Sequence, residues 1–145
     1  IQILCLCELS KRMSQLSARE DLDFSRPDTI AAYYMEDMRH LEQENLKLLL
    51  LNTKNILLRD ITVSRGTVNA SCATPREIYI EALRFRACGI ILLHNHPSGD
   101  VTPSPEDKEL TKRLAMLGGM MQLCLTDHII VGDSDFFSFR QAGLI

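Results

Sequence analysis

The chain has 145 residues and a mass of 16.4 kDa, with 46% hydrophobic and 24% charged residues, as is ordinary for one soluble globular domain. A formal charge of −3, from 19 acidic and 16 basic side chains, argues against a domain held on nucleic-acid phosphates by charge. The five scattered cysteines form no Cys-x-x-Cys pair, which argues against a disulfide framework and a thiolate zinc site. Apolar runs are too short for a membrane helix and no signal peptide is visible, so we expect a cytoplasmic protein without a membrane span.

The opening segment predicts an amphipathic helix, because apolar residues recur at helical spacing from Leu4 to Leu16. Arg26-Pro27 then marks a boundary, since the residue before a proline is disfavoured in a helix. We therefore expect residues 1–26 to be a helix and linker that end an upstream helical region. Residues 27–145 are expected to form the main domain.

The main domain is expected to alternate helices with strands. We predict three helices in this domain. The first starts at Asp28 and ends near Glu42, the second starts at Thr74, and the third starts at Ser104 and ends at Gly118-Gly119. The predicted strands are Leu46–Leu51, Ile56–Val63, Thr67–Ala70, Ile90–Leu93, Met120–Leu125 and Ile129–Val131, followed by an aromatic segment at Phe136–Phe139. The first two strands flank a turn-type cluster and read as an antiparallel hairpin. This alternation favours an α/β fold with a mixed sheet flanked by helices.

The stretch from His94 to Asp107 carries the candidate chemistry. It follows an apolar strand and runs through a turn-rich loop into a helix, where functional residues concentrate. Alternation along an extended backbone places His94 and His96 on one face, so that two imidazole nitrogens can converge on one ion. Asp107 lies one turn into the helix if Ser104 is the N-cap, and it can supply a third ligand. Two histidines and one carboxylate leave a fourth tetrahedral position for water, as in catalytic rather than structural zinc sites.

A simpler interpretation of the helix start needs no metal. Ser104-Pro105-Glu106-Asp107 offers a hydroxyl cap, a proline at the first helical position and carboxylates that the helix dipole favours. That interpretation does not explain the paired histidines. Local charge also favours a cation over a phosphate, because the stretch from Ala87 to Asp107 contains three acidic residues and no Lys or Arg.

A zinc hydrolase also needs a base, and a carboxylate that does not bind the metal is the usual one. The upstream candidates are Glu42, Glu44 and Glu77. Glu77 is explained as a capping-box residue, and Glu42 is expected on the outer face of its helix. Glu44 stands at the start of the first strand, from which a side chain could reach the end of the His94 strand. Composition does not choose among the three.

The spacing of four residues is similar to the JAMM (MPN-plus) metalloprotease motif. His94-x-His96 is followed after seven residues by Ser104, and Ser104 is followed after two residues by Asp107. With its wider context, the chain resembles the RadC family over about residues 27–145. That context is Glu44 to Asn55, Gly66-Thr67, Pro75-Arg76-Glu77, His94–Gly99, Pro103-Ser104, Asp127-His128 with Ile129-Ile130, and Ser138-Phe139. The resemblance implies a cytidine-deaminase-like three-layer α/β domain, with a mixed sheet between helices.

The resemblance also implies functional roles. His94, His96 and Asp107 would bind Zn²⁺, Ser104 would donate a hydrogen bond to the water or oxyanion, and Glu44 would be the base. The implied reaction is hydrolysis of an amide or isopeptide bond in a peptide or protein substrate by a zinc-activated water.

Two parts of the resemblance leave roles open. Leu46 departs from the family pattern, which commonly has an aromatic residue there, so Glu44 is carried over less directly than the metal ligands. Asp127 and His128 match a family pair for which a contact to a metal ligand and a purely structural role both remain open.

Two other functions compete with hydrolysis. The family is named for a DNA-repair connection, so the chain could be a repair module that acts through partners or DNA rather than by catalysis. Its isolated basic pairs, such as Arg84 with Arg86, give direct DNA binding by this fragment little support. A metal-free scaffold would lack the ligand positions that this chain retains. The substrate and the oligomeric state stay open.

Overall fold

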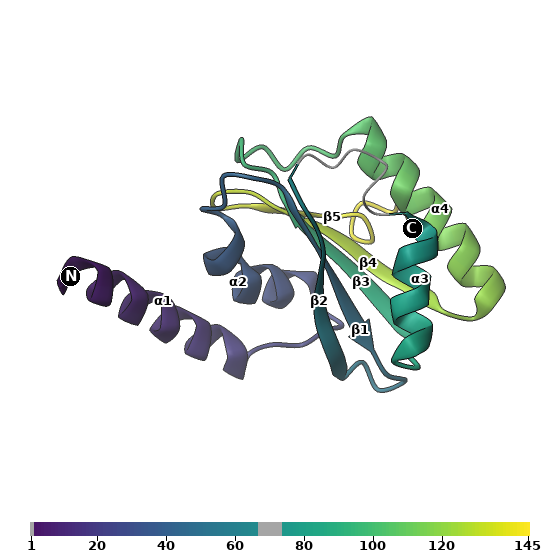
Figure 1. The fold of residues 1–145 in the computed structure, drawn as a ribbon, viewed down its shortest axis with the longest axis horizontal. Helices are drawn as coiled ribbons and strands as arrows, with labels where there is room; N and C mark the ends of the chain where they lie inside the picture. The colour runs from purple at the N-terminus through teal and green to yellow at the C-terminus, as the bar shows by residue number, and fades with distance from the viewer. Residues whose placement is uncertain (1, 67–73) are drawn as a thin grey trace.

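The computed structural model describes residues 2–66 and 74–145, so the expected strand at Thr67–Ala70 lies outside the described residues. Figure 1 shows a twisted sheet with helices on both faces and a first helix that projects from the body. The elements in chain order are α1 (Gln2–Glu20), α2 (Pro27–Met38), β1 (Asn45–Leu51), β2 (Leu57–Arg65), α3 (Pro75–Arg84), β3 (Gly89–Asn95), α4 (Pro105–Met121), β4 (Cys124–Val131) and β5 (Phe136–Ser138).

Within the described residues, the strands form one five-stranded sheet in the order β2-β1-β3-β4-β5. β1 pairs antiparallel with β2, which confirms the predicted hairpin, and antiparallel with β3 on its other side. β3 and β4 are parallel, and α4 makes the crossover between them, whereas β5 returns antiparallel to β4. The sheet is therefore mixed, and the carboxyl end of β3 leads into the loop before α4.

The sheet separates two hydrophobic layers, because successive side chains of a strand point to opposite faces. On β1, Leu48 and Leu50 pack with α3 and α4, whereas Leu49 and Leu51 pack with α2. The central strand β3 is buried along its whole length, as expected for a strand covered on both faces. The predicted three-layer α/β architecture is thus confirmed.

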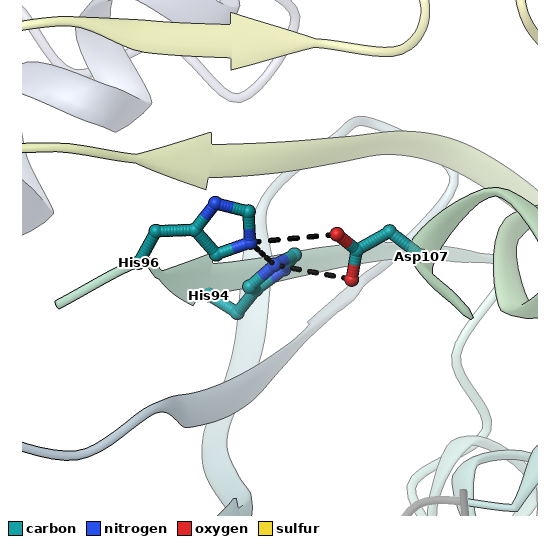
Figure 2. Close-up of side chains that lie close together, drawn as sticks. All are labelled: His94, His96 and Asp107. Atoms are coloured by element: carbon teal, nitrogen blue, oxygen red, sulfur yellow. Dashed lines mark hydrogen bonds and ion pairs between the residues drawn. The ribbon is translucent and has the colours of Figure 1, made fainter. Parts of the chain in front are cut away.

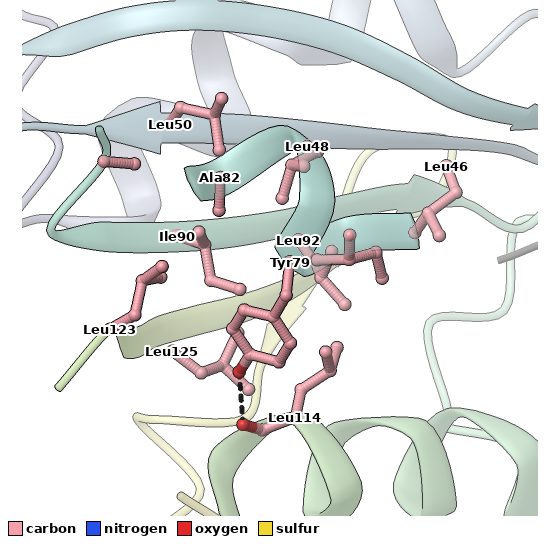
Figure 3. Close-up of a cluster of buried hydrophobic side chains, with 12 residues drawn as sticks. Leu46, Leu48, Leu50, Tyr79, Ala82, Ile90, Leu92, Leu114, Leu123 and Leu125 are labelled. Atoms are coloured by element: carbon pink, nitrogen blue, oxygen red, sulfur yellow. Dashed lines mark hydrogen bonds between the residues drawn. The ribbon is translucent and has the colours of Figure 1, made fainter. Parts of the chain in front are cut away.

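A buried hydrogen bond joins the two helices of one layer. Figure 3 shows the cluster on the side of α3 and α4, where Tyr79 Oη donates to the Leu114 carbonyl oxygen at 2.5 Å. Burial raises the pKa of Tyr79 to about 12, so the phenol keeps its hydrogen for this bond.

The boundaries of α4 and β4 differ from those predicted. The helix does not end at Gly118-Gly119 but runs to Met121, where Gln122 caps it in the left-handed conformation. Gly118 is needed for close packing, since a Cβ there would collide with the Leu123 carbonyl oxygen and lie 2.7 Å from the hydroxyl of Tyr79. Residues 120 and 121, which were expected in a strand, are therefore helical, and the strands expected at Met120–Leu125 and Ile129–Val131 are replaced by the single strand β4.

The first two helices also differ in part from the prediction. α2 has Arg26 as its N-cap and Pro27 at its first position, and it ends at Met38 rather than near Glu42. The predicted amphipathic helix is present as α1, which contacts α2 through an ion pair between Lys11 Nζ and Asp37 Oδ1 (2.7 Å). Among the described residues, we find no helix with the length and hydropathy of a membrane span.

Candidate metal centre

The candidate centre lies where β3 ends and α4 begins. His94 is the last but one residue of β3, aligned with Leu46 of β1 and Ile130 of β4, and only 1% of it is exposed. The pairing of β3 with β4 extends one residue further, because the His96 N–H donates to the Val131 carbonyl at 3.0 Å. The backbone therefore stays extended from His94 to His96, and both rings lie on one face, as predicted.

Three side chains converge at this point. Figure 2 shows the rings of His94 and His96 and the carboxylate of Asp107 pointing toward one another. His94 Nε2 lies 3.0 Å from His96 Nε2 and 3.3 Å from Asp107 Oδ1, and His96 Nε2 lies 3.4 Å from Asp107 Oδ2. Tetrahedral zinc with bonds of about 2.0–2.1 Å would separate such donor atoms by about 3.3–3.4 Å. The group fits a single small metal ion.

The capping interpretation and the ligand interpretation of the α4 start hold together. Ser104 is the N-cap, and its Oγ accepts from the Asp107 N–H (3.1 Å), while Asp107 Oδ2 accepts from the Ser104 N–H (2.8 Å). Burial raises the pKa of Asp107, but the neighbouring His94 ring and the hydrogen bonds from Ser104 outweigh it and hold the pKa below its ordinary value. The cap thus aims an ionised carboxylate at the two histidines.

Of the three carboxylate candidates, the structure brings Glu44 to the centre. Glu44 directly precedes β1, and its Oε1 lies 3.8 Å from His96 Nε2. Glu77 instead completes a capping box with Thr74 at the start of α3, where its Oε2 accepts from the Thr74 N–H at 3.2 Å. Glu42 is exposed. The position of Glu44 matches the one needed for a base beside the ligands, whereas its role remains a prediction.

Asn95, which lies between the two histidines, holds the segment that carries Glu44. Its Oδ1 accepts from the Asn45 N–H at 2.8 Å, and its Nδ2 donates to the Gln43 carbonyl at 3.1 Å. Asn95 is 1% exposed, so the amide end of both bonds is buried, whereas Asn45 is half-buried and Gln43 is exposed. Sequence reasoning missed this residue because its partners lie about fifty positions away along the chain and a lone asparagine gives no sign of them.

Each histidine of the centre is oriented through its second ring nitrogen. His96 Nδ1 lies 2.7 Å from the Asp100 carbonyl oxygen, and since a carbonyl only accepts, Nδ1 carries the hydrogen. His94 Nδ1 lies 2.8 Å from His128 Nε2. His128 therefore touches a candidate metal ligand directly, whereas its role stays a prediction.

Asp127, the neighbour of His128, points to the opposite face of the sheet. Its carboxylate accepts from the Ser138 hydroxyl (2.6 Å) and from the backbone N–H groups of Arg140 (3.0 Å) and His128 (2.7 Å). Burial raises the pKa of Asp127, and these three bonds oppose the rise. Asp127 therefore anchors the segment after β5 and does not reach the candidate metal ligands.

The chain matches the RadC-like JAB domain over residues 24–144. It is 45% identical over 147 residues to a UPF0758 protein of Clostridium botulinum (strain Loch Maree / Type A3), and 45% identical over 145 residues to one of Geobacillus sp. (strain WCH70). Each comparison covers 100% of this chain and 64% of the relative, so the chain spans about 64% of the length of these relatives. Because the domain match runs from just before α2 to the penultimate residue, the chain belongs to the RadC-like JAB domain family.

Proposed function

We propose that this domain is a zinc-dependent hydrolase of amide or isopeptide bonds in peptide or protein substrates. The observation that carries the proposal is the convergence of His94, His96 and Asp107 with Glu44 beside them, 3.8 Å from His96 Nε2. Two imidazoles and one carboxylate are a ligand set that zinc takes in catalytic sites, where a fourth position stays open. Membership of the JAB family supports the same chemistry.

Different residues of the chain would bind the metal, transfer the proton and stabilise the oxyanion. Zinc held by the three ligands would polarise the substrate carbonyl and lower the pKa of the attacking water. The Glu44 carboxylate would take a proton from the water molecule as the water oxygen bonds to the substrate carbonyl carbon. It would then deliver that proton to the leaving nitrogen of the substrate as the carbon–nitrogen bond breaks. Ser104 Oγ accepts the Asp107 N–H, so its own hydroxyl hydrogen is available to the developing oxyanion.

Glu44→Gln tests the proposed base. The amide keeps the size of the side chain but cannot take up a proton, so we expect the variant to bind zinc like the wild type and to hydrolyse about 10²–10⁴-fold more slowly. The probes are a panel of fluorogenic peptides and a lysine-linked isopeptide, assayed on zinc-loaded protein. Glu42→Gln is the matched control, because Glu42 is exposed and two residues away.

The outcomes separate the competing functions. Equal hydrolysis by the wild type and Glu44→Gln would refute the base assignment. A wild-type protein that neither binds zinc nor cleaves any probe would favour the alternative, a DNA-repair-associated module that acts through partner or DNA binding.

A further inference from the structure

A closed ring of buried contacts joins two of the candidate metal ligands. From His94 Nδ1 it passes to His128 Nε2 (2.8 Å), and from His128 Nδ1 to Thr111 Oγ1 (2.6 Å). Thr111 Oγ1 in turn donates to the Asp107 carbonyl oxygen at 2.6 Å, and Asp107 Oδ1 returns to His94 Nε2 at 3.3 Å. His128 and Thr111 are at most 1% exposed, so no water competes for the hydrogen bonds that these two side chains make.

The direction of each bond follows from one carbonyl group. The Asp107 carbonyl only accepts, so the Thr111 hydroxyl hydrogen is spent on it, and Thr111 Oγ1 must accept from His128 Nδ1. A neutral imidazole carries one hydrogen, which leaves His128 Nε2 as an acceptor. His94 Nδ1 must then be the donor, and the lone pair of His94 is left on Nε2, the nitrogen that faces His96 and Asp107.

Packing keeps the His128 ring in this orientation. Phe139 stacks on it with ring centroids 4.7 Å apart and planes 7° from parallel. The two histidine ligands are thus oriented by different means, since His96 depends on the loop carbonyl of Asp100 and His94 on the buried ring. A change at His128 should therefore act on His94 and leave the bond of His96 intact.

We propose that His128 is a positioning residue of the metal centre, which together with Thr111 holds His94 as the Nδ1–H tautomer so that Nε2 is presented to zinc. The inference rests on the proposed function, because it requires zinc at His94. Hydrogen bonds to the second nitrogen of a ligating histidine set its tautomer and its basicity, and their loss weakens metal binding by about 10–100-fold.

Two substitutions separate hydrogen bonding from packing. His128→Phe keeps a flat ring against Phe139 but offers no acceptor to His94, whereas His128→Gln can place Oε1 near the position of Nε2 and accept again. We expect His128→Phe to bind zinc about 10–100-fold more weakly than the wild type in a competition titration with a chelator, and His128→Gln to recover most of the loss. Thermal unfolding followed by circular dichroism establishes that each variant is folded.

A spectroscopic measurement on the wild-type protein needs no substitution. Long-range ¹⁵N–¹H spectra of the zinc-loaded protein report which nitrogen of each imidazole carries hydrogen, and we expect Nδ1 for both His94 and His128. Hydrogen on His128 Nε2, or equal zinc affinity of the wild type and His128→Phe, would overturn the inference and leave the proposed zinc site standing. Failure of the wild type to take up zinc would refute the proposed function, and the inference with it.

Discussion

Replacing Asn95 by alanine should destabilise the fold without removing a metal ligand. The side chain bonds the backbone on both sides of Glu44, at Gln43 and at Asn45. Alanine removes both bonds and, with them, the direct side-chain link between the end of β3 and the backbone on either side of Glu44. We therefore expect two separable effects, a loss of stability and a loss of hydrolysis, with zinc binding retained.

The size of the stability loss follows from the two bonds. Each of these bonds contributes about 1 kcal/mol net, and the Asn45 N–H loses its partner while the Gln43 carbonyl keeps Asn45 Nδ2, so the free energy of unfolding should fall by about 1–3 kcal/mol. Asn45→Ala is the matched control, because Asn45 Nδ2 donates to the same Gln43 carbonyl in an exposed bond of 2.9 Å. Water replaces an exposed donor readily, so the control should change stability by less than about 0.5 kcal/mol.

Urea unfolding of the metal-free proteins measures both changes, and a zinc titration of each variant measures the affinity. Equal free energies of unfolding for Asn95→Ala and Asn45→Ala would refute the role given to the buried amide. A large loss of zinc affinity in Asn95→Ala would show that this residue supports the ligands rather than the Glu44 segment.

Two further predictions concern stability away from the ligands. Gly118→Ala should lower the free energy of unfolding by about 1–3 kcal/mol, because the added methyl group collides with Leu123 and Tyr79. Gly119→Ala places its methyl group in open space and should raise the free energy of unfolding by up to about 1 kcal/mol. Equal effects of the two substitutions in urea unfolding would contradict the claim that Gly118 is required for close packing. Because the pKa of Asp127 is raised above 3.8, the folded chain holds this proton more tightly, and its stability falls as pH rises from 3.8 through the folded pKa. The free energy of unfolding of Asp127→Asn minus that of the wild type should therefore increase with pH across this window, by at most about 1.4 kcal/mol per pH unit, and a flat difference would contradict the assignment.

The convergence of the three candidate metal ligands could be predicted from the sequence because their geometry is local. His94 and His96 are two residues apart on an extended backbone, and Asp107 has a fixed place in the first turn of a capped helix. Only the fold of the loop between them had to be assumed. The position of Glu44, by contrast, came from the family resemblance, since its approach to His96 depends on how β1 pairs with β3.

The supporting residues were harder to foresee because their partners are distant in sequence. Nothing in the sequence around Thr111 distinguishes it from an ordinary helix residue. Its bond to His128 depends on the packing of α4 on β4. The prediction that α4 ends at Gly118-Gly119 was wrong for a similar reason, because Gly118 allows close packing against Tyr79 and does not break the helix. Tertiary contacts override local helix propensity at such positions.

Metal content tests the central claim most directly. Purified protein is stripped with a chelator, incubated with zinc, desalted and examined by elemental mass spectrometry, with His96→Ala treated in parallel. We expect about one zinc per wild-type chain and loss of that zinc in His96→Ala, since His96 is one of three converging ligands. A wild-type chain that takes up no zinc, or a His96→Ala variant that retains it fully, would contradict the assignment of the metal centre.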